Sequence, residues 1–201
     1  MFITFEGIDG SGKSTQIKLL CKYLKQNKLP YLSIREPGGT EFAEQIREIL
    51  LSSKNEINPI TELMLFEAAR ADLTEKVIMP SLKEGTIVIS DRFFDSTTAY
   101  QGYGRGLNLK SVEVCNKFAT QNLYPDLTFY FHLPIDVAIK RRSFKKADRM
   151  ESAGEDFFSR VVKGFLRIAR KEPERFIIID ATKSKDEIFE EIKRVINSRI
   201  K

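Results

Sequence analysis

The chain has 201 residues, of which 42% are hydrophobic and 30% are charged. This composition excludes a disordered chain, and the length is sufficient to bury the core of one domain without disulfides or a structural metal. No apolar run approaches the ~18 residues of a membrane span, and the net charge of +5 is compatible with either nucleic acid or small polyanions such as nucleotides as partners.

The N-terminal segment and the cysteines favour a cytoplasmic protein. Residues 1–6 lack the basic region and the long apolar stretch of a signal peptide. Cys21 and Cys115 are far apart, form no CxxC pair and fall within helical patterns, which is typical of structural thiols in a reducing compartment. We therefore expect a cytoplasmic location and no membrane partner.

Short apolar runs rich in β-branched or aromatic residues predict the strands. They are too apolar on both faces for a half-exposed sheet, and therefore indicate parallel strands covered by helices. In chain order the runs are Phe2–Phe5, Tyr31–Ile34, Thr86–Ile89, Leu127–Phe131 and Phe176–Ile179.

Helical patterns alternate with these runs, which predicts a single doubly wound α/β domain over residues 1–201. In such a sheet ligands bind beyond the carboxyl ends of the strands, so the residues after each strand are the candidates for a site. The predicted helices are Ser14–Asn27, Glu41–Leu51, Ile60–Leu82, Lys110–Gln121, Ile135–Lys146, Glu155–Lys171 and Lys185–Ile200.

A phosphate-binding loop follows the first predicted strand. Residues 7–14 match G-x-x-x-x-G-K-[ST] and a helical pattern begins at once, which is the context that makes this motif specific. The glycines bring backbone N–H groups to phosphate oxygens, Lys13 can reach the β- and γ-phosphates, and the Ser14 hydroxyl can hold Mg²⁺. The residues expected to contact the phosphates of ATP are Gly7, Ile8, Asp9, Gly10, Ser11, Gly12, Lys13, Ser14 and Thr15.

Asp9 is unusual in this loop, because a carboxylate among the phosphate-binding residues repels the nucleotide. We expect it to contact either a hydroxyl of an acceptor or a metal-bound water. The alternative is an outward-facing aspartate of the kind that is common in loops.

A second charged pair, Asp91 and Arg92, follows the third predicted strand. An aspartate beside the phosphate-binding loop is suitably placed to orient Mg²⁺ or its waters, and the arginine supplies a planar fork for phosphate. Ser14 and Asp91 are thus the expected metal residues, largely through water. A solvated ion pair at a strand end is the alternative.

Two pairs of side chains four residues apart could recognise a base. Thr97 and Gln101 would share one face of a helical turn, and Phe66 and Arg70 would do so in the long helix. A hydroxyl and a carboxamide can read a base edge, while an aromatic ring can stack on the base. Core packing for Phe66 and a solvated position for Arg70 are the alternatives.

Together these motifs resemble the thymidylate kinase family, whose members phosphorylate dTMP to dTDP using ATP and Mg²⁺. The resemblance covers essentially the whole chain and implies a P-loop nucleoside monophosphate kinase fold, with a parallel sheet of order 2-3-1-4-5 and a homodimer. The matching residues are Phe5 to Thr15, Arg35 to Thr40, Phe66 with Arg70, Asp91 to Phe93, Ala99 to Gly102 and Asp148 to Glu151.

The resemblance implies a role for each residue at the base. Phe66 would stack on thymine, and its edge would be hydrogen-bonded by Arg70, Thr97 and Gln101. Tyr100 would occupy the space of a ribose 2′-hydroxyl and so select deoxyribose.

The resemblance also implies roles nearer the transferred phosphate. Arg92 and Arg47 would hold the acceptor phosphate, and Glu36 would line the same site through water or metal. Asp9 would contact the sugar 3′-hydroxyl or the hydration shell of the metal.

The phosphate-binding loop has no arginine at Ile8 to Ser11, although a donated arginine can raise the rate of phosphoryl transfer by ~10³–10⁵. Six of the ten residues 140–149 are basic, so a small lid at about residues 140–152 would supply the charge, as in bacterial-type family members. A solvated helix end is the alternative. Arg142 and Arg149 are the favoured contacts, with Arg141, Lys145 and Lys146 as further candidates, and the expected catalytic set is Lys13, Asp91, Arg92, Arg142 and Arg149.

Three other functions are weighed against this one. A kinase for another monophosphate or nucleoside is disfavoured by the base-facing set above. A GTPase-like switch lacks the Asn-Lys-x-Asp motif for guanine. A nucleic-acid-binding module fits the basic charge, but the basic cluster is confined to the predicted lid and no aromatic-basic interleaving accompanies it, so no nucleic-acid partner is expected.

Overall fold

The computed structural model describes residues 1–52, 54–142, 149 and 154–199. Within these residues the strands form one parallel sheet in the order β2-β3-β1-β4-β5, which confirms the order implied by the family resemblance. The strands are β1 (Phe2–Glu6), β2 (Tyr31–Arg35), β3 (Ile87–Asp91), β4 (Leu127–His132) and β5 (Phe176–Asp180).

Each strand continues past its predicted apolar run to end on a polar residue. The five terminal residues are Glu6, Arg35, Asp91, His132 and Asp180. Backbone pairing extends beyond the apolar side chains, for example where Phe5 of β1 lies beside Asp91 of β3. Because the strands are parallel, these polar ends gather at one edge of the sheet.

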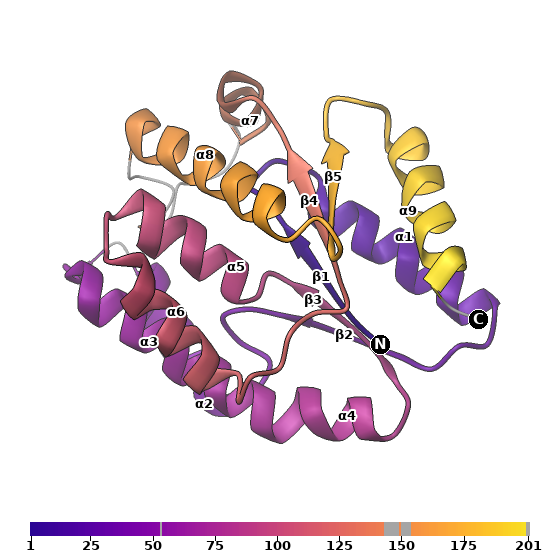
Figure 1. Cartoon of the computed structure of the whole chain (residues 1–201), viewed down its shortest axis with the longest axis horizontal. Helices are drawn as coiled ribbons and strands as arrows, with labels where there is room; N and C mark the ends of the chain where they lie inside the picture. Colours follow the sequence, from indigo (N-terminus) through magenta and orange to yellow (C-terminus); the bar gives the residue numbers. More distant parts are fainter. Residues whose placement is uncertain (53, 143–148, 150–153, 200–201) are drawn as a thin grey trace.

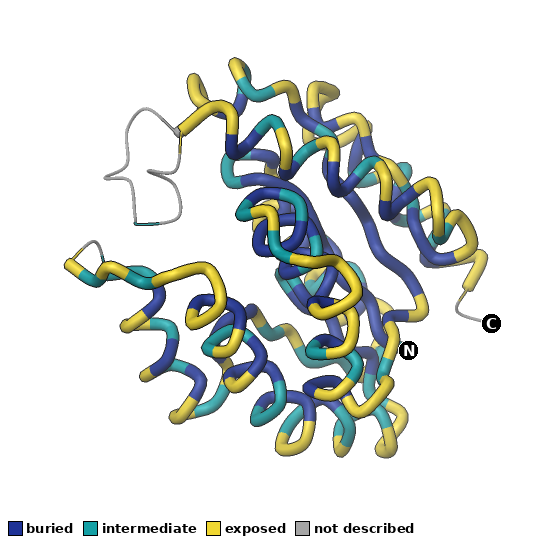
Figure 2. Tube along the Cα trace, turned by 60° about the vertical axis from the view of Figure 1, so that its left-hand side comes forward, coloured by how far each residue is buried: buried dark blue, intermediate teal, exposed yellow. Residues whose placement is uncertain are grey.

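Helices cover both faces of the sheet (Figure 1). α1 (Lys13–Gln26) and α9 (Lys185–Arg199) lie together on one side, while α3 (Pro59–Leu73), α6 (Leu109–Ala119) and α8 (Glu155–Lys171) lie on the other. Figure 2 shows the resulting burial, with dark strands at the centre and exposed outer faces on the helices. No helix in the described ranges is long and apolar enough to cross a membrane.

The predicted helix Ile60–Leu82 forms, but with a change of pitch. α3 is followed without a break by a π-helical turn, η1 (Thr74–Ile78), and by α4 (Met79–Lys83). The N-cap Asn58 accepts hydrogen bonds from the N–H groups of Ile60 and Thr61, at 3.1 and 2.9 Å. α2 (Glu41–Leu51) packs beside α3. α7 (Ile135–Arg142) begins where predicted, and the rest of its predicted range lies outside the described residues.

One helical element was not predicted as a helix. α5 (Phe94–Thr97) continues into the π-helical η2 (Thr98–Gly104), and nearly all of its residues are buried. A helix buried on every side has no amphipathic period, which is why the pattern missed it. Gly104 is needed for the packing against α8, because a Cβ there would lie 2.6 Å from the Phe157 ring.

Candidate active site

A cavity of about 590 Å³ opens at the carboxyl ends of β1, β2 and β3. It extends from the loop before α1 to α3 and η2, so it joins the predicted phosphate end to the predicted base end. Most of the predicted site residues line it: Asp9, Gly10, Gly12, Lys13, Ser14, Thr15, Glu36, Arg47, Phe66, Arg70, Asp91, Arg92, Thr97, Tyr100 and Gln101.

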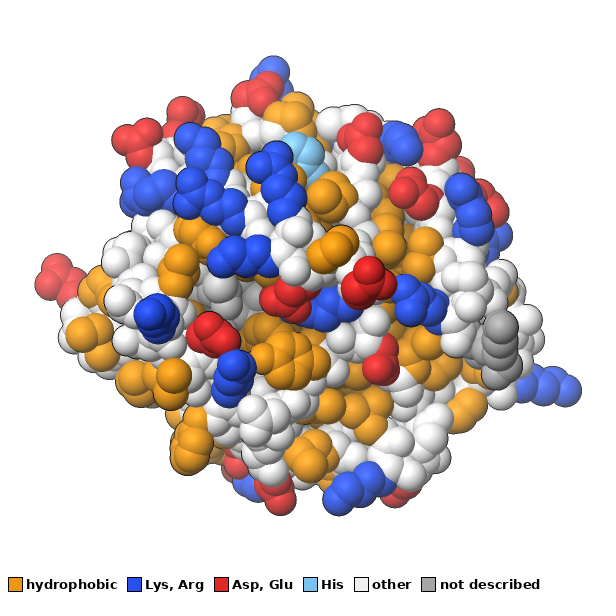
Figure 3. Space-filling model, in the orientation of Figure 1, with side chains coloured by type: hydrophobic (Ala, Val, Ile, Leu, Met, Phe, Trp, Pro, Cys, Tyr) orange, Lys and Arg blue, Asp and Glu red, His pale blue; other side chains and the backbone are white. Residues whose placement is uncertain are grey.

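The surface charge of the face seen in Figure 1 is mixed. Figure 3 shows basic side chains gathered at the upper left, over α8, while acidic and basic side chains alternate across the middle of this face. The described part of α7 adds Lys140 and Arg141, and Arg141 also lines the cavity. On this face, positive charge is therefore concentrated at α8 and the described part of α7.

The loop from Gly7 to Gly12 has the backbone geometry that a phosphate cradle requires. Gly7 has φ 141°, and a Cβ on it would lie 2.7 Å from the carbonyl oxygen of Phe131, so no larger residue fits between β1 and β4. Gly12 has φ 93° and directly precedes α1. The first N–H groups of α1 therefore face the cavity with the positive end of the helix dipole.

Lys13 is buried under this loop. Its Nζ donates to the carbonyl oxygens of Gly7 and Ile8, at 3.0 and 3.3 Å. Burial lowers the pKa of Lys13, as does the nearby charge of Arg92, while the carboxylates of Asp91 and Asp9 raise it. These carboxylates balance the positive charge of Lys13 only in part, and a phosphate in the loop would supply further negative charge.

Ser14 and Asp91 present two oxygens side by side. The Ser14 hydroxyl donates to Asp91 Oδ2 at 3.0 Å, which joins the start of α1 to the end of β3. A hydroxyl and a carboxylate are the hard oxygen ligands that Mg²⁺ prefers. This donor pair fits the predicted metal position.

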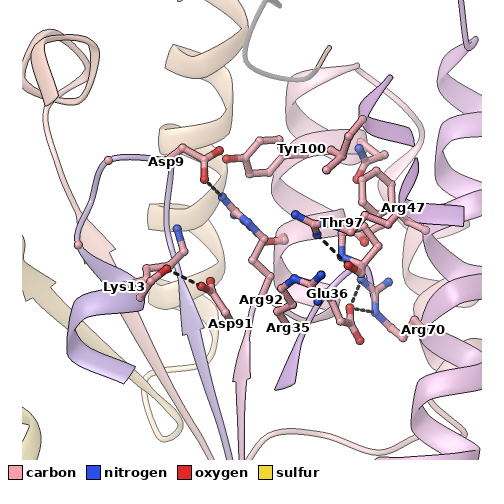
Figure 4. A pocket seen from close by; sticks show the side chains of 18 of the residues that line it. Asp9, Lys13, Arg35, Glu36, Arg47, Arg70, Asp91, Arg92, Thr97 and Tyr100 are labelled. Atoms are coloured by element: carbon pink, nitrogen blue, oxygen red, sulfur yellow. Dashed lines mark hydrogen bonds and ion pairs between the residues drawn. The ribbon is translucent and has the colours of Figure 1, made fainter. Parts of the chain in front are cut away.

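Asp9 is paired with Arg92, and 42% of its side chain is exposed. Asp9 Oδ1 lies 3.0 Å from Arg92 Nη2, and Figure 4 shows this ion pair across the cavity. Arg92 has a left-handed backbone, with φ 74°, and its N–H donates to the Phe5 carbonyl at 3.0 Å. The guanidinium also donates to Ser96 Oγ at 3.1 Å. The arginine is thus held with its charge turned into the cavity.

Glu6 is a site-shaping residue that the sequence reasoning missed. Its buried carboxylate accepts hydrogen bonds from the Phe93 N–H at 2.7 Å and from Ser96 Oγ at 2.5 Å. Burial, followed by the charge of Asp95, raises the pKa of Glu6 to about 8, although the Arg92 charge opposes this. A charged residue closing an apolar strand was the available signal.

Arg70 is buried between two carboxylates, so it is not a solvated helix residue. Its Nε and Nη2 bind Glu36 Oε2 at 2.8 and 2.7 Å, and its Nη1 binds Glu67 Oε1 at 2.7 Å. Burial raises the pKa of Glu36 to about 7, and Arg70 lowers it in part. Figure 4 shows this cluster at the far end of the cavity from Lys13.

The wall between these two ends contains polar atoms without partners. The buried oxygens Thr97 Oγ1, Tyr100 Oη and Glu36 Oε1 form no hydrogen bond within the described part of the chain. Phe66 is half-buried on the same cavity, and Arg47 donates to the Pro37 carbonyl at 2.8 Å. Orphaned buried polar atoms beside an aromatic ring are what a polar, planar ligand would complete.

Comparison with known proteins decides the family. The thymidylate kinase family model matches residues 5–192. Curated thymidylate kinases from Kosmotoga olearia and Thermosipho africanus are 50% and 48% identical, over 96% and 100% of this chain and 93% and 99% of their own lengths. The chain belongs to the thymidylate kinase family. The crystal structure of thymidylate kinase from Ehrlichia chaffeensis superposes with a TM-score of 0.78 at 37% identity, covering 98% of each chain, which confirms the predicted fold class.

The lid expected in this thymidylate kinase family member is described only in part. The side chain of Arg142 lies outside the described residues, as do Lys145 and Lys146. Arg149 does not line the cavity. Its Nη1 lies 2.6 Å from Glu62 Oε2 and its Nε donates to the Leu50 carbonyl at 2.8 Å.

Arg141 does reach the cavity. Its Nη1 donates to the Ala181 carbonyl at 3.0 Å and lies 3.5 Å from the Gly10 carbonyl, beside the phosphate loop. It links α7 to the segment after β5. Of the basic residues that the sequence proposed for the lid, Arg141 is therefore the one that the described chain places against the phosphate end.

Glu62 is a second residue that the sequence reasoning missed. It lies on α3 one helical turn before Phe66 and two before Arg70, on the same face. Its carboxylate is fully buried and contacts Gln101, Arg105 and Arg149. The spacing of Glu62, Phe66 and Arg70 was the signal that could have revealed it.

Proposed function

We propose that this protein transfers the γ-phosphate of ATP to dTMP, giving dTDP and ADP for dTTP synthesis. One observation carries the proposal: a single cavity of about 590 Å³ contains the phosphate loop at one end and the Phe66–Arg70 wall at the other. A donor triphosphate and an acceptor monophosphate can meet in such a cavity without water between them.

The donor end binds the phosphates of ATP through Gly7 to Thr15. Backbone N–H groups at the start of α1 hold the phosphate oxygens, and Lys13 contacts the β- and γ-phosphates. The third N–H of the Lys13 ammonium makes no hydrogen bond to the residues described, which leaves a donor for a phosphate.

Mg²⁺ would be held by Ser14 and Asp91, largely through water. The described chain has no group of three or more acidic, histidine or cysteine side chains that could bind a metal, so phosphates and waters would complete the shell. When bound, the cation neutralises charge on the phosphates. Asp91 would orient its waters and Ser14 would supply a hydroxyl.

The acceptor end binds dTMP along the opposite wall. Phe66 stacks on thymine, and Arg70, Thr97 and Gln101 hydrogen-bond its edge. Tyr100 blocks a ribose 2′-hydroxyl, because its ring is held at 6.0–6.4 Å from the rings of Phe157, Phe158 and Phe165 and has little room to move.

The acceptor phosphate lies between the two ends. Arg92 and Arg47 hold it, Asp9 contacts the sugar 3′-hydroxyl or a metal-bound water, and Glu36 faces it through water. Two arginines fix both the position and the charge of a phosphate. The Asp9–Arg92 ion pair supports this assignment, because it keeps both side chains turned to the same point.

In the transfer step an oxygen of the dTMP phosphate attacks the γ-phosphorus, and the bond from that phosphorus to the β–γ bridging oxygen breaks. The attacking oxygen is already anionic, so no catalytic base is needed and positioning with positive charge suffices. Lys13 and Arg92 supply charge from the described chain. A lid at about residues 140–152 adds Arg142 and Arg149, and Arg149 must leave Glu62 to do so.

We also propose a homodimer, formed through α2, α3 and α6. Exposed apolar side chains gather on these neighbouring helices, and Phe118 of α6 has 88% of its surface exposed. Exposed apolar side chains that gather on adjacent helices are typical of an interface. The set is Phe42, Ile49, Ile60, Met64, Leu109, Val114 and Phe118.

Both cysteines are free thiols, which supports a cytoplasmic location.

Turnover of five acceptors at equal concentration, namely dTMP, dUMP, dGMP, UMP and thymidine, tests the assignment. We expect dTMP to be phosphorylated fastest, because Phe66 offers thymine an aromatic ring to stack on and Tyr100 excludes a 2′-hydroxyl. A clear preference for dGMP or UMP would identify a different nucleotide kinase.

A further inference from the structure

The Glu62 carboxylate lies behind the base end of the cavity without lining it. It has 0% exposure and accepts hydrogen bonds from η2 and from the residue that directly follows it. Gln101 Nε2 donates to Oε1 at 2.9 Å, and Arg105 donates to Oε1 through Nε and to Oε2 through Nη2, both at 3.1 Å. Arg149 Nη1 lies 2.6 Å from Oε2.

These donors keep Glu62 ionised. Burial raises its pKa, but the hydrogen bonds and charge of Arg105, with hydrogen bonds from Gln101 and Arg149, lower the pKa below its ordinary value. An ionised carboxylate can only accept hydrogen bonds. The carboxamide of Gln101 must therefore turn its NH₂ group to Glu62.

This orientation determines what Gln101 offers to a ligand. Gln101 lines the cavity and its side chain is buried. With its nitrogen held by Glu62, the carbonyl oxygen is the polar atom left for the cavity. A carbonyl oxygen accepts a hydrogen bond from the N3–H of thymine or uracil, whereas the N3 of cytosine has no hydrogen and would face it with a lone pair.

We propose that Glu62 is a positioning residue for base selection: it fixes Gln101 so that the site accepts a pyrimidine with an N3–H and rejects cytosine. This inference rests on the proposed function, because it requires the base to lie against Gln101. It goes beyond that function by assigning the choice between bases to a residue outside the cavity.

Glu62→Gln should reverse the orientation of the Gln101 carboxamide. While Arg149 is still on Glu62, as the base binds, Oε2 faces two arginine nitrogens, Arg105 Nη2 and Arg149 Nη1, whereas Oε1 faces one, Arg105 Nε, beside Gln101. The oxygen of the new carboxamide is therefore favoured on the Oε2 side. Its NH₂ group then meets Gln101, which must turn over to offer its oxygen. The NH₂ group of Gln101 would now face the cavity, where it pairs with the N3 of cytosine and opposes the N3–H of thymine.

The experiment compares kcat/KM for dTMP and dCMP in the wild type and in Glu62→Gln. We expect the dTMP:dCMP ratio to fall about ten- to hundredfold, the range for one mispaired buried polar group, with the KM for ATP unchanged. An unchanged ratio in a folded, ATP-binding variant would overturn the inference. Absence of dTMP turnover in the wild type would instead refute the proposed function, so the two failures are distinguishable.

A second background tests whether Glu62 acts through Gln101. Gln101→Leu removes the carboxamide, so adding Glu62→Gln to it should leave the dTMP:dCMP ratio within about twofold, because the coupling partner is gone. If Glu62→Gln changes the ratio equally in both backgrounds, it acts by another route and the inference is wrong.

A measurement on the unmodified side chain covers the case in which Glu62→Gln does not fold. In protein with ¹⁵N-labelled glutamine, the Gln101 amide signal can be assigned from its absence in Gln101→Leu. We expect slow hydrogen exchange and little shift when dTMP binds, because the NH₂ group stays on Glu62. Fast exchange, or a large shift with dTMP, would contradict the inference.

Discussion

Arg92 Nη2 lies 3.0 Å from Asp9 Oδ1, so the residue that follows β3 is tied directly to the phosphate loop that follows β1. The same guanidinium binds Ser96, whose hydroxyl is hydrogen-bonded to the buried Glu6 carboxyl group. Arg92 is therefore fixed before any substrate arrives. Charge that is already in place costs no reorganisation when the phosphate is transferred.

The role of Lys13 is tested by Lys13→Ala. We expect kcat to fall by about 10²- to 10³-fold, the range for removing one group that stabilises transition-state charge, with a smaller effect on KM. Lys18→Ala, on the exposed face of the same helix, is the matched control and should keep kcat. A kcat for Lys13→Ala within a few-fold of the wild type would show that the assigned role is wrong.

Arg70 is predicted to serve both dTMP binding and stability. Arg70→Ala should raise the KM for dTMP at least tenfold and leave the KM for ATP within about twofold, because one charged hydrogen bond to a ligand is lost. It should also cost about 3–5 kcal/mol of unfolding free energy, since Glu36 and Glu67 lose their shared counter-charge.

Arg70→Lys separates the two effects. It keeps the charge between the carboxylates but not the planar fork, so most of the stability should remain while the KM for dTMP still rises. Steady-state kinetics and urea unfolding measure both quantities. Equal increases in KM for dTMP and ATP would place Arg70 outside the acceptor site.

The raised pKa of Glu6 predicts that the stability of the folded protein depends on pH. Its pKa is raised from 4.5 to about 8 in the folded protein, so the folded state favours the protonated carboxyl. Below about pH 4.5 Glu6 is protonated in both states and the folded protein has its full stability. As the pH rises towards 8, the unfolded state loses the proton more readily than the folded state, so the free energy of unfolding falls. Relative to Glu6→Gln, the wild type should lose stability across this window, by at most about 1.4 kcal/mol per pH unit. Urea unfolding of the two proteins at pH 5 and at pH 8 measures this. If the difference in unfolding free energy between the wild type and Glu6→Gln is the same at both pH values, the prediction is wrong.

The homodimer predicts a response to charge on α6. Phe118→Glu should convert dimer to monomer, because it places a charge in an apolar interface. Ile178→Glu, at a site 46% exposed on the edge strand β5, is the control and should leave the dimer intact. Light scattering measures the mass. A monomeric wild type would refute the dimer.

Much of the fold was predictable because the three central strands, β1, β3 and β4, are buried on both faces. Runs such as Leu127–Phe131 are buried at every position, and parallel pairing then places their carboxyl ends at one edge. The polar residues at the ends of β2 and β3, which are Arg35, Glu36, Asp91 and Arg92, accordingly line the cavity. That geometry is why Lys13, Asp91 and Arg92 could be grouped from sequence before their distances were known.

The missed residues are buried charges. The local signals for them, a charge at the end of a strand for Glu6 and a helical spacing for Glu62, do not reveal which side chains enclose them. Glu6, Glu62 and Glu67 look like ordinary acidic residues until the fold encloses them with Ser96, Arg105 and Arg70. The residues of η2 were recognised by motif but not as a helix, because a fully buried helix has no polar face. The partners that enclose a buried charge come from distant segments of the chain, so spacing along one helix can single out a residue but cannot identify those partners.

The most direct test of the central claim is the stoichiometry of phosphoryl transfer by the purified chain. With ATP, Mg²⁺ and dTMP, separation of the nucleotides should show one dTDP formed for each ATP converted to ADP, and almost no ADP when dTMP is omitted. Nucleotide hydrolysis that proceeds without dTMP and yields no dTDP would contradict the account and indicate a hydrolytic switch instead.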